Sequence, residues 1–177
     1  MRTRDVNETE MRDFIASVTD DERRYYDVEP ERIVHTSVFS KGIEVDRELV
    51  AVGGIARWYR LFHYPWYVVK TRYQGRGIGS QLVGDLFSFA EKHSITLLLV
   101  VVERENTASV KILNAQGCRK IVSKNSRDYV YRPFNRWGEL AGRYVLPVVV
   151  RMYLSPVGGV LRVARRSRQL NKIVEGY

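Results

Sequence analysis

Three closely spaced glycines, Gly75, Gly77 and Gly79, constrain the fold of this chain more than any other feature. Residues 63–70 before them are rich in β-branched and aromatic residues, which is typical of a strand, and residues 77–93 carry apolar residues at helical spacing. Such a turn exposes several backbone N–H groups together, because no Cβ lies in the way, and the helix N-terminus adds partial positive charge. The turn therefore predicts either a pyrophosphate-binding site or a plain tight turn.

Two familiar phosphate-binding loops do not fit this turn. A P-loop needs Gly-Lys-Ser/Thr, which Gly79-Ser80-Gln81 does not supply. In the GxGxxG turn of dinucleotide-binding proteins the third glycine would stand one residue later, although Glu103 lies roughly where the ribose-binding acid is expected. A doubly wound sheet is also disfavoured, because the turn follows what reads as an antiparallel meander and few strands come after it.

The remaining pattern predicts an α+β fold with a mixed sheet. The expected elements are strands at 1–5, 32–40, 48–58, 63–70 and 95–102, helices at 11–18, 22–26, 77–93 and 106–115, and a hairpin of 119–123 with 129–132. They form an antiparallel meander, a strand–glycine-rich turn–helix–strand unit, a further helix and a closing hairpin. Inside the third of these strands, Gly53-Gly54 indicates a bulge or a close backbone approach.

Composition and charge divide the chain into two parts. Of its 177 residues 45% are hydrophobic, as in a globular domain, and the single cysteine, Cys118, allows no intramolecular disulfide. The net charge is +9, but residues 134–177 hold eight Lys/Arg against two acids and so carry most of it. The N-terminus is polar, so we expect no signal peptide and a cytoplasmic location.

Two motifs resemble those of the GCN5-related N-acetyltransferase (GNAT) superfamily. The segment from Gln74 to Gly79 is similar to its Gln/Arg-x-x-Gly-x-Gly/Ala signature, and the segment from Asn106 to Gly117 to its Asn-x-x-Ala/Ser…Gly-Phe helix. The resemblance covers residues 1–133 and implies an acyl-CoA-binding domain. It further implies an N-acyltransferase that uses acetyl-CoA as co-substrate and passes the acyl group directly to an amine in a ternary complex. The alternatives are a CoA-binding protein without catalysis and a membrane-surface adaptor with an acyltransferase-like core.

The resemblance also implies the residues that bind the cofactor. They are Val69, Thr71, Gln74, Gly75, Arg76, Gly77, Ile78, Gly79, Ser80, Asn106, Ser109 and Lys111. The first two would bond the pantetheine arm through their backbones, and the run from Gln74 to Ser80 would hold the pyrophosphate. Asn106 would orient the pantetheine or the loop beside it, and the last two could reach the nucleotide end.

The catalytic acid and base are less well marked. The family's thiolate-protonating tyrosine aligns with Leu113, which cannot donate a proton, so the general acid stays unassigned or is water. Three residues are candidates for the base that deprotonates the amine. His63 is suited by a pKa near neutrality but could be a strand or turn histidine without a role. Glu103 and Glu105 could act through a water, or could be solvated loop residues or helix N-terminal charges.

Aromatic side chains crowd the hairpin before the glycine turn. They include Trp58, Tyr59, Phe62, Tyr64, Trp66 and Tyr67. Such side chains could line an apolar pocket for the acceptor, or could simply pack in the core.

The C-terminal extension, residues 134–177, exceeds the family's minimal domain. Its segment 144–161 is apolar except for Arg151, but Pro147, Pro156 and a Gly-Gly pair interrupt it, so a spanning helix is not expected. The following segment is basic and amphipathic. We expect the extension to pack on the domain or to form a homodimer. An anionic membrane surface is the alternative partner, while nothing beyond charge supports nucleic acid.

Overall fold

The computed structural model describes residues 1–19, 22, 30–58 and 62–155 of the chain. Its strands are β1 (Arg2–Asp5), β2 (Ser37–Val45), β3 (Glu48–Trp58), β4 (Phe62–Val69), β5 (Leu97–Glu103), β6 (Arg119–Lys124) and β7 (Arg127–Pro133). Its helices are α1 (Glu8–Ser17), α3 (Pro30–Thr36), the 3₁₀ turn η1 (Thr71–Tyr73), α4 (Ile78–Lys92), α5 (Thr107–Ala115), α6 (Arg136–Leu140), the π-helical turn η2 (Ala141–Val145) and α7 (Leu146–Leu154). The predicted α+β class is confirmed.

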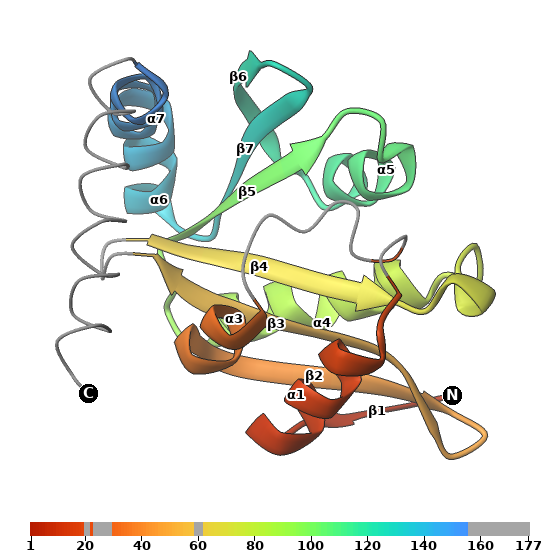
Figure 1. Ribbon diagram of the computed structural model, residues 1–177. Helices are drawn as coiled ribbons and strands as arrows, with labels where there is room; N and C mark the ends of the chain where they lie inside the picture. Colours follow the sequence, from red (N-terminus) through yellow and green to blue (C-terminus); the bar gives the residue numbers. More distant parts are fainter. Residues whose placement is uncertain (20–21, 23–29, 59–61, 156–177) are drawn as a thin grey trace, which may run out of the picture.

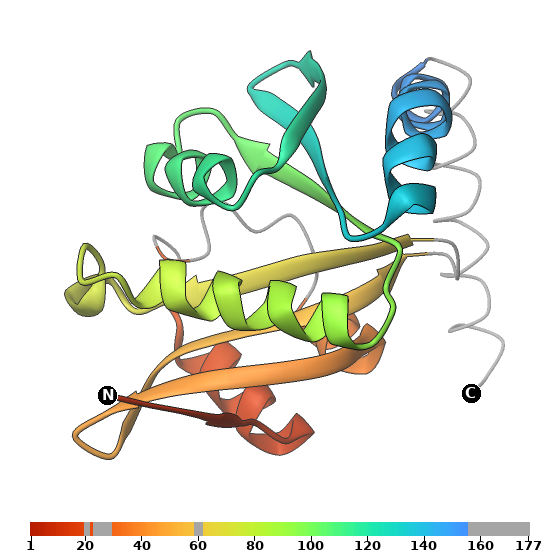
Figure 2. The ribbon, with the colours of Figure 1, turned by 180° about the vertical axis from the view of Figure 1, so that it is seen from behind.

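All seven strands form one sheet, in the order β1-β2-β3-β4-β5-β7-β6. Helices α1 and α3 cover one face of its first half and α4 covers the other (Figures 1 and 2). Strands β1 to β4 pair antiparallel in chain order, as the predicted meander requires. The pair Gly53-Gly54 is not a bulge, because its register with β2 is regular. It is a close backbone approach, since a Cβ on Gly54 would lie 2.6 Å from the carbonyl oxygen of Phe39.

The prediction of a strand over residues 32–40 is wrong in its first half. Helix α3 continues to Thr36, and β2 then runs on past Lys41-Gly42 to Val45. The hydroxyls of Thr36 and Ser37 donate to the carbonyls four residues earlier, at 2.6 and 2.7 Å, and adjacent Ile33 and Val34 are both buried. These contacts stabilise a helical turn although its residues are β-branched. The helix predicted at 22–26 lies outside the described residues except for Glu22.

Strands β4 and β5 form the only parallel pair among the described strands, and one pair of residues, His63 and Leu98, joins them. Beyond this pair the two strands diverge toward their C-terminal ends (Figure 1). Strand β4 leads into η1 and α4, β5 leads into α5, and β5 pairs on its other edge with β7 of the confirmed closing hairpin. The divergence therefore opens the sheet between two helix N-termini.

The described part of the extension is one continuous helical segment that packs on the sheet. Leu146 and Val150 are fully buried in a cluster with apolar residues of β5 and β7. The expected interruption at Pro147 is wrong, because the helical segment continues through this proline, which closely follows a π turn. The preceding π turn is closed by a bond from the Leu146 N–H to the Ala141 carbonyl. No helix among the described residues is both long and apolar enough to cross a membrane.

Candidate functional site

The glycine turn has the backbone conformation that its sequence predicts. Gly75 and Gly77 have positive φ angles of 76° and 79°, and a Cβ on either would meet no atom within 4 Å. Both therefore keep a left-handed backbone beside open space. Gly79 serves another purpose, since a Cβ there would lie 3.2 Å from Cδ1 of Ile112 and would press α4 away from α5.

The turn presents free hydrogen-bond donors. Helix α4 begins after Gly77, and its first bond runs from the Gln81 N–H to the Gly77 carbonyl at 3.0 Å. Within the described residues, none of the backbone N–H groups from Gly75 to Ser80 has a hydrogen-bond partner. Arg76 is exposed beside them, with its guanidinium 5.4 Å from the ring of Tyr73. Unbonded N–H groups at a helix N-terminus, with a nearby cation, are the features that favour the binding of an anion.

An acidic residue on β3 holds the segment that precedes the glycines of this turn. Glu48 accepts hydrogen bonds from Arg72, from Lys70 at 3.0 Å and from the Tyr73 hydroxyl at 2.9 Å. The Arg72 guanidinium, followed by Lys70 and Tyr73, lowers the pKa of Glu48 to about 2. One carboxylate thus joins the β2–β3 hairpin to three side chains between β4 and the glycines.

Backbone groups of the two residues expected to bond the pantetheine arm, Val69 and Thr71, form hydrogen bonds with side chains of the protein. Gln74 Nε2 donates to the Val69 carbonyl at 3.0 Å, so this side chain links the start of the glycine turn to the end of β4. The Thr71 N–H donates to the carboxylate of Glu22 at 2.5 Å. Thr71 can therefore offer its N–H to a ligand only when Glu22 moves.

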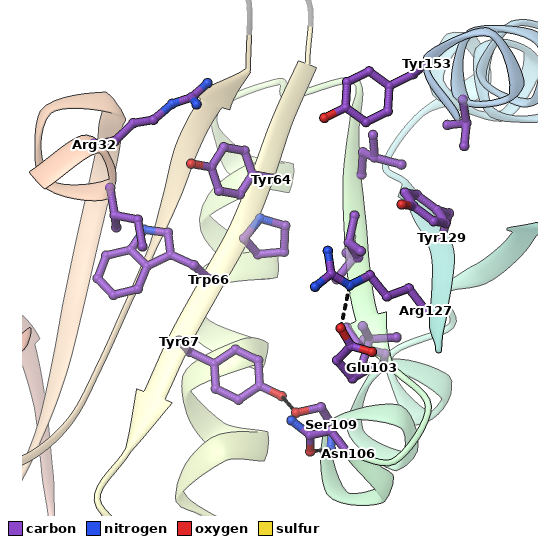
Figure 3. Close-up of a pocket in the computed structure, with 18 residues that line it drawn as sticks. Arg32, Tyr64, Trp66, Tyr67, Glu103, Asn106, Ser109, Arg127, Tyr129 and Tyr153 are labelled. Atoms are coloured by element: carbon purple, nitrogen blue, oxygen red, sulfur yellow. Dashed lines mark hydrogen bonds and ion pairs between the residues drawn. The ribbon is translucent and has the colours of Figure 1, made fainter. Parts of the chain in front are cut away.

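A cavity of about 340 Å³ lies in the opening between β4 and β5. Figure 3 shows it between Tyr64, Trp66 and Tyr67 of β4 and residues from β5, α5, β7 and α7. Val101 of β5 lines this cavity and is half exposed. The opening of the sheet is thus a space walled by aromatic and aliphatic side chains.

A hydrogen bond crosses this space (Figure 3). The Tyr67 hydroxyl on β4 donates to Ser109 Oγ on α5 at 2.7 Å. Asn106 caps α5, since its Oδ1 accepts the Ser109 N–H at 3.1 Å, and so fixes the position of Ser109. Burial raises the pKa of Tyr67, although the bond to Ser109 acts the other way, so its hydroxyl keeps its proton at neutral pH. Lys111, on the same helix, is exposed and does not line the cavity.

Of the three candidate bases, only Glu103 lines the cavity. It accepts hydrogen bonds from Arg127 Nε and from Ser126 Oγ, the latter at 2.6 Å. His63 lies where β4 and β5 last pair, opposite Arg57 of β3, and burial followed by the Arg57 charge lowers its pKa. Glu105 is exposed before α5.

Several cavity residues could not be found by motif. Tyr129 and Arg127 come from β7, which topology places beside β5, and Tyr153 comes from α7. Leu113, at the position where the family has its tyrosine, is buried and also lines the cavity, and the hydroxyl-bearing Tyr67 of β4 lines the same cavity. Burial raises the pKa of the Cys118 thiol to about 12, so this thiol is not a reactive nucleophile at neutral pH.

A glycine turn with free backbone N–H groups, beside two diverging parallel strands, is the arrangement found in the N-acetyltransferase fold. The chain belongs to the acetyltransferase (GNAT) family, whose sequence model matches residues 3–118 and so includes both motifs. The resemblance seen in the sequence is therefore confirmed. No curated protein matches the chain by sequence.

Solved structures show the same fold at low identity. The protein yncA from Salmonella typhimurium, solved with its cofactor acetyl-CoA, is 12% identical, with a TM-score of 0.64 over 77% of this chain and 95% of that one. An N-acetyltransferase from Staphylococcus aureus Mu50 is 14% identical, with a TM-score of 0.61 over 76% and 98%. A ribosomal-protein-alanine N-acetyltransferase from Brucella melitensis is 17% identical, with a TM-score of 0.57 over 74% and 97%.

Proposed function

We propose that this chain is an acyl-CoA-dependent N-acyltransferase, with acetyl-CoA as donor, that transfers the acyl group directly to an amine in a ternary complex. The observation that carries the proposal is the row of free N–H groups from Gly75 to Ser80, placed at the end of β4 beside the cavity. Family membership supports it, as does the acetyl-CoA bound to the Salmonella protein of the same fold.

The residues present fit such a co-substrate. A diphosphate needs several converging donors without a Cβ in its path, and Gly75 and Gly77 leave that space open. The backbone of Val69 lies at the end of β4, on one side of the opening between β4 and β5. Asn106 and Ser109 lie on the other side of this opening. Acyl-CoA would supply an acyl group activated as a thioester. The protein would bind it along this opening and bring the amine to the same place.

Two side chains of the cavity suit the proton transfers. An amine attacks only when neutral, so an ammonium substrate needs a proton acceptor. Glu103 is a carboxylate in the cavity and would accept this proton directly or through water. Tyr67 holds its proton at neutral pH, because burial raises its pKa, and would provide an acid where Leu113 cannot. The sequence alone left the general acid unassigned and offered three candidates for the base. The proposed acid is Tyr67 and the proposed base is Glu103.

The cavity also suggests the kind of acceptor. Its walls are largely aromatic and aliphatic, with Glu103, Arg127 and Asn106 on one side and the Arg32 guanidinium on the other side of β4 (Figure 3). An amine carried on an apolar or aromatic group would bury that group against Tyr64, Trp66 and the neighbouring side chains.

A CoA-binding protein without catalysis is the second candidate function, and Leu113 in place of the family's tyrosine favours it. Calorimetry with CoA and acetyl-CoA tests binding, and release of free thiol from acetyl-CoA with a panel of aliphatic, aromatic and peptide amines tests transfer. Acylated amine detected by mass spectrometry would establish the enzyme. Binding without transfer to any amine would favour the second candidate, and absence of binding would overturn both.

A further inference from the structure

An exposed apolar stripe runs along the C-terminal helix, defined as residues 136–154. Trp137, Tyr144 and Met152 expose 75%, 62% and 67% of their surface, and Leu140, Val145 and Val148 are exposed beside them. Large apolar side chains gathered on one outer surface mark an interaction site more often than single exposed ones do.

The stripe follows from the helical register. Gly138, Gly142, Leu146 and Val150, spaced by four, are buried toward the sheet. Residues two positions further along a helix lie on roughly the opposite side. These positions, 140, 144, 148 and 152, are all exposed and all apolar. The helix thus has two apolar faces, and only one of them contacts the described part of the protein.

The charges of this helix are almost all positive. Arg136, Arg143 and Arg151 are exposed, and the single acid, Glu139, forms an ion pair with Arg119 of β6. The sequence that follows is also basic, with five Lys/Arg and no acid between residues 162 and 172. The apolar stripe therefore lies beside cations that no acid of the same helix balances.

We propose that this stripe docks on an anionic membrane surface. Trp and Tyr side chains prefer the headgroup region of a bilayer, and apolar residues such as Val148 and Met152 would enter it. The arginines would reach the lipid phosphates, as long cationic side chains do at the edge of a membrane. The attraction of the arginines to anionic lipid and the burial of the apolar stripe in the bilayer surface would then act together, as they do in helices that bind at a membrane interface.

A second copy of the chain fits this face less well. A two-fold contact through the stripe would bring Arg136, Arg143 and Arg151 of one copy near the same residues of the other, without a free acid on the helix to pair with them. Nucleic acid would use the arginines but would leave the apolar stripe in water. The opposite side of the same helix gives Val150 and Tyr153 to the cavity, so docking would hold the cavity about one helix diameter, roughly 10 Å, from the lipid.

Co-sedimentation of the full chain with vesicles of phosphatidylcholine, with and without phosphatidylglycerol, tests the proposal. We expect binding only to vesicles with the anionic lipid, weakened by added salt. The triple variant Arg136→Gln, Arg143→Gln, Arg151→Gln should bind on the order of 100-fold more weakly, since each cation contributes about fivefold. The triple variant Trp137→Ser, Tyr144→Ser, Met152→Ser should also lose most binding. A control with Arg12, Lys92 and Arg104 changed to Gln removes three exposed charges elsewhere and should bind within a few fold of wild type.

Four outcomes would overturn the proposal. The first is no binding to anionic vesicles at low salt. The second is equal weakening by the control and by the arginine variant. The third is loss of binding only when Arg165, Arg166 and Arg168 are changed to Gln, which would assign it to the following segment. The fourth is a concentration-dependent dimer in sedimentation velocity that the serine variant abolishes while vesicles do not bind. Melting curves of each variant show whether it is folded, and the arginine variant changes exposed residues alone.

Discussion

The Tyr67 hydroxyl donates a 2.7 Å hydrogen bond to Ser109 Oγ and so links β4 to α5 across the place where the sheet opens. Its proton stays bound at neutral pH because burial raises the pKa of the phenol. The two side chains come from the two walls of the opening, 42 positions apart in sequence. Both side chains line the cavity.

Replacing Tyr67 with Phe separates a structural role of the pair from a chemical one. Both Tyr67→Phe and Ser109→Ala remove the same hydrogen bond, which costs about 1 kcal/mol of stability. If Tyr67 supplies a proton, only Tyr67→Phe should lower kcat, by on the order of 100-fold. Steady-state thiol release with one accepted amine measures this. Equal kcat values for the two variants would remove Tyr67 from the chemistry.

Replacing Gly77 with Ala tests the anion-binding turn. The new Cβ would meet no protein atom but would stand in the open space where the diphosphate is expected. Calorimetry should show acetyl-CoA affinity reduced on the order of tenfold or more, a loss of about 1.4 kcal/mol or more. Gly117→Ala is the control, because Gly117 also has a positive φ, 73°, away from the turn; its Cβ would in addition displace the end of the Arg132 side chain, 2.6 Å away. Unchanged affinity in Gly77→Ala would contradict the assignment of the turn.

Local features of this site could be predicted from the sequence and long-range ones could not. The glycine turn and the helix predicted at 106–115 depend on neighbouring residues, and both are present in the structure. Arg127 and Tyr153 enter the cavity only because β7 and α7 fold back on β5, which no local pattern encodes. The helix boundary at Thr36 differs from the prediction because burial of Ile33 outweighs the strand preference of its neighbours.

The identity of the base can be tested with two variants that break the same ion pair. Glu103→Gln and Arg127→Gln both separate these side chains, but only the first removes a proton acceptor from the cavity. We expect Glu103→Gln to lower kcat/KM by on the order of 100-fold and Arg127→Gln to lower it less. His63→Gln should stay within a few fold of wild type. If His63 were the base, its variant would instead lose an acidic limb of the pH profile below about pH 6.5, because burial lowers the pKa of His63.

Glu48 should make stability depend on pH in the acid range. Its hydrogen bonds from Arg72, Lys70 and Tyr73 lower its pKa to about 2, below the ordinary value of 4.5. A carboxyl group whose pKa is lower in the folded protein than in the unfolded one stabilises the fold at pH values above its unfolded-state pKa. This stabilisation is lost as the pH falls toward its folded-state pKa. Glu48→Gln should therefore melt below wild type at pH 7, with the difference shrinking from about pH 4.5 to pH 2. A difference that stays constant over that range would refute the role of the carboxylate charge.

Two glycines in helical segments should respond to alanine in opposite ways. In η2, a Cβ on Gly142 would lie 1.9 Å from Cε2 of buried Tyr131, so the C-terminal helix would have to move from the sheet. Overpacking of this kind costs about 1–3 kcal/mol, against about 1 kcal/mol gained from helix propensity. In α4, a Cβ on Gly84 would meet Gln116 Nε2 at an ordinary 3.7 Å, so Gly84→Ala should keep that gain. Since 1 kcal/mol shifts Tm by about 2–4 °C at this size, Gly84→Ala should melt above wild type and Gly142→Ala below it. A Gly142→Ala protein at least as stable as wild type would mean that the C-terminal helix does not pack on β7 in solution.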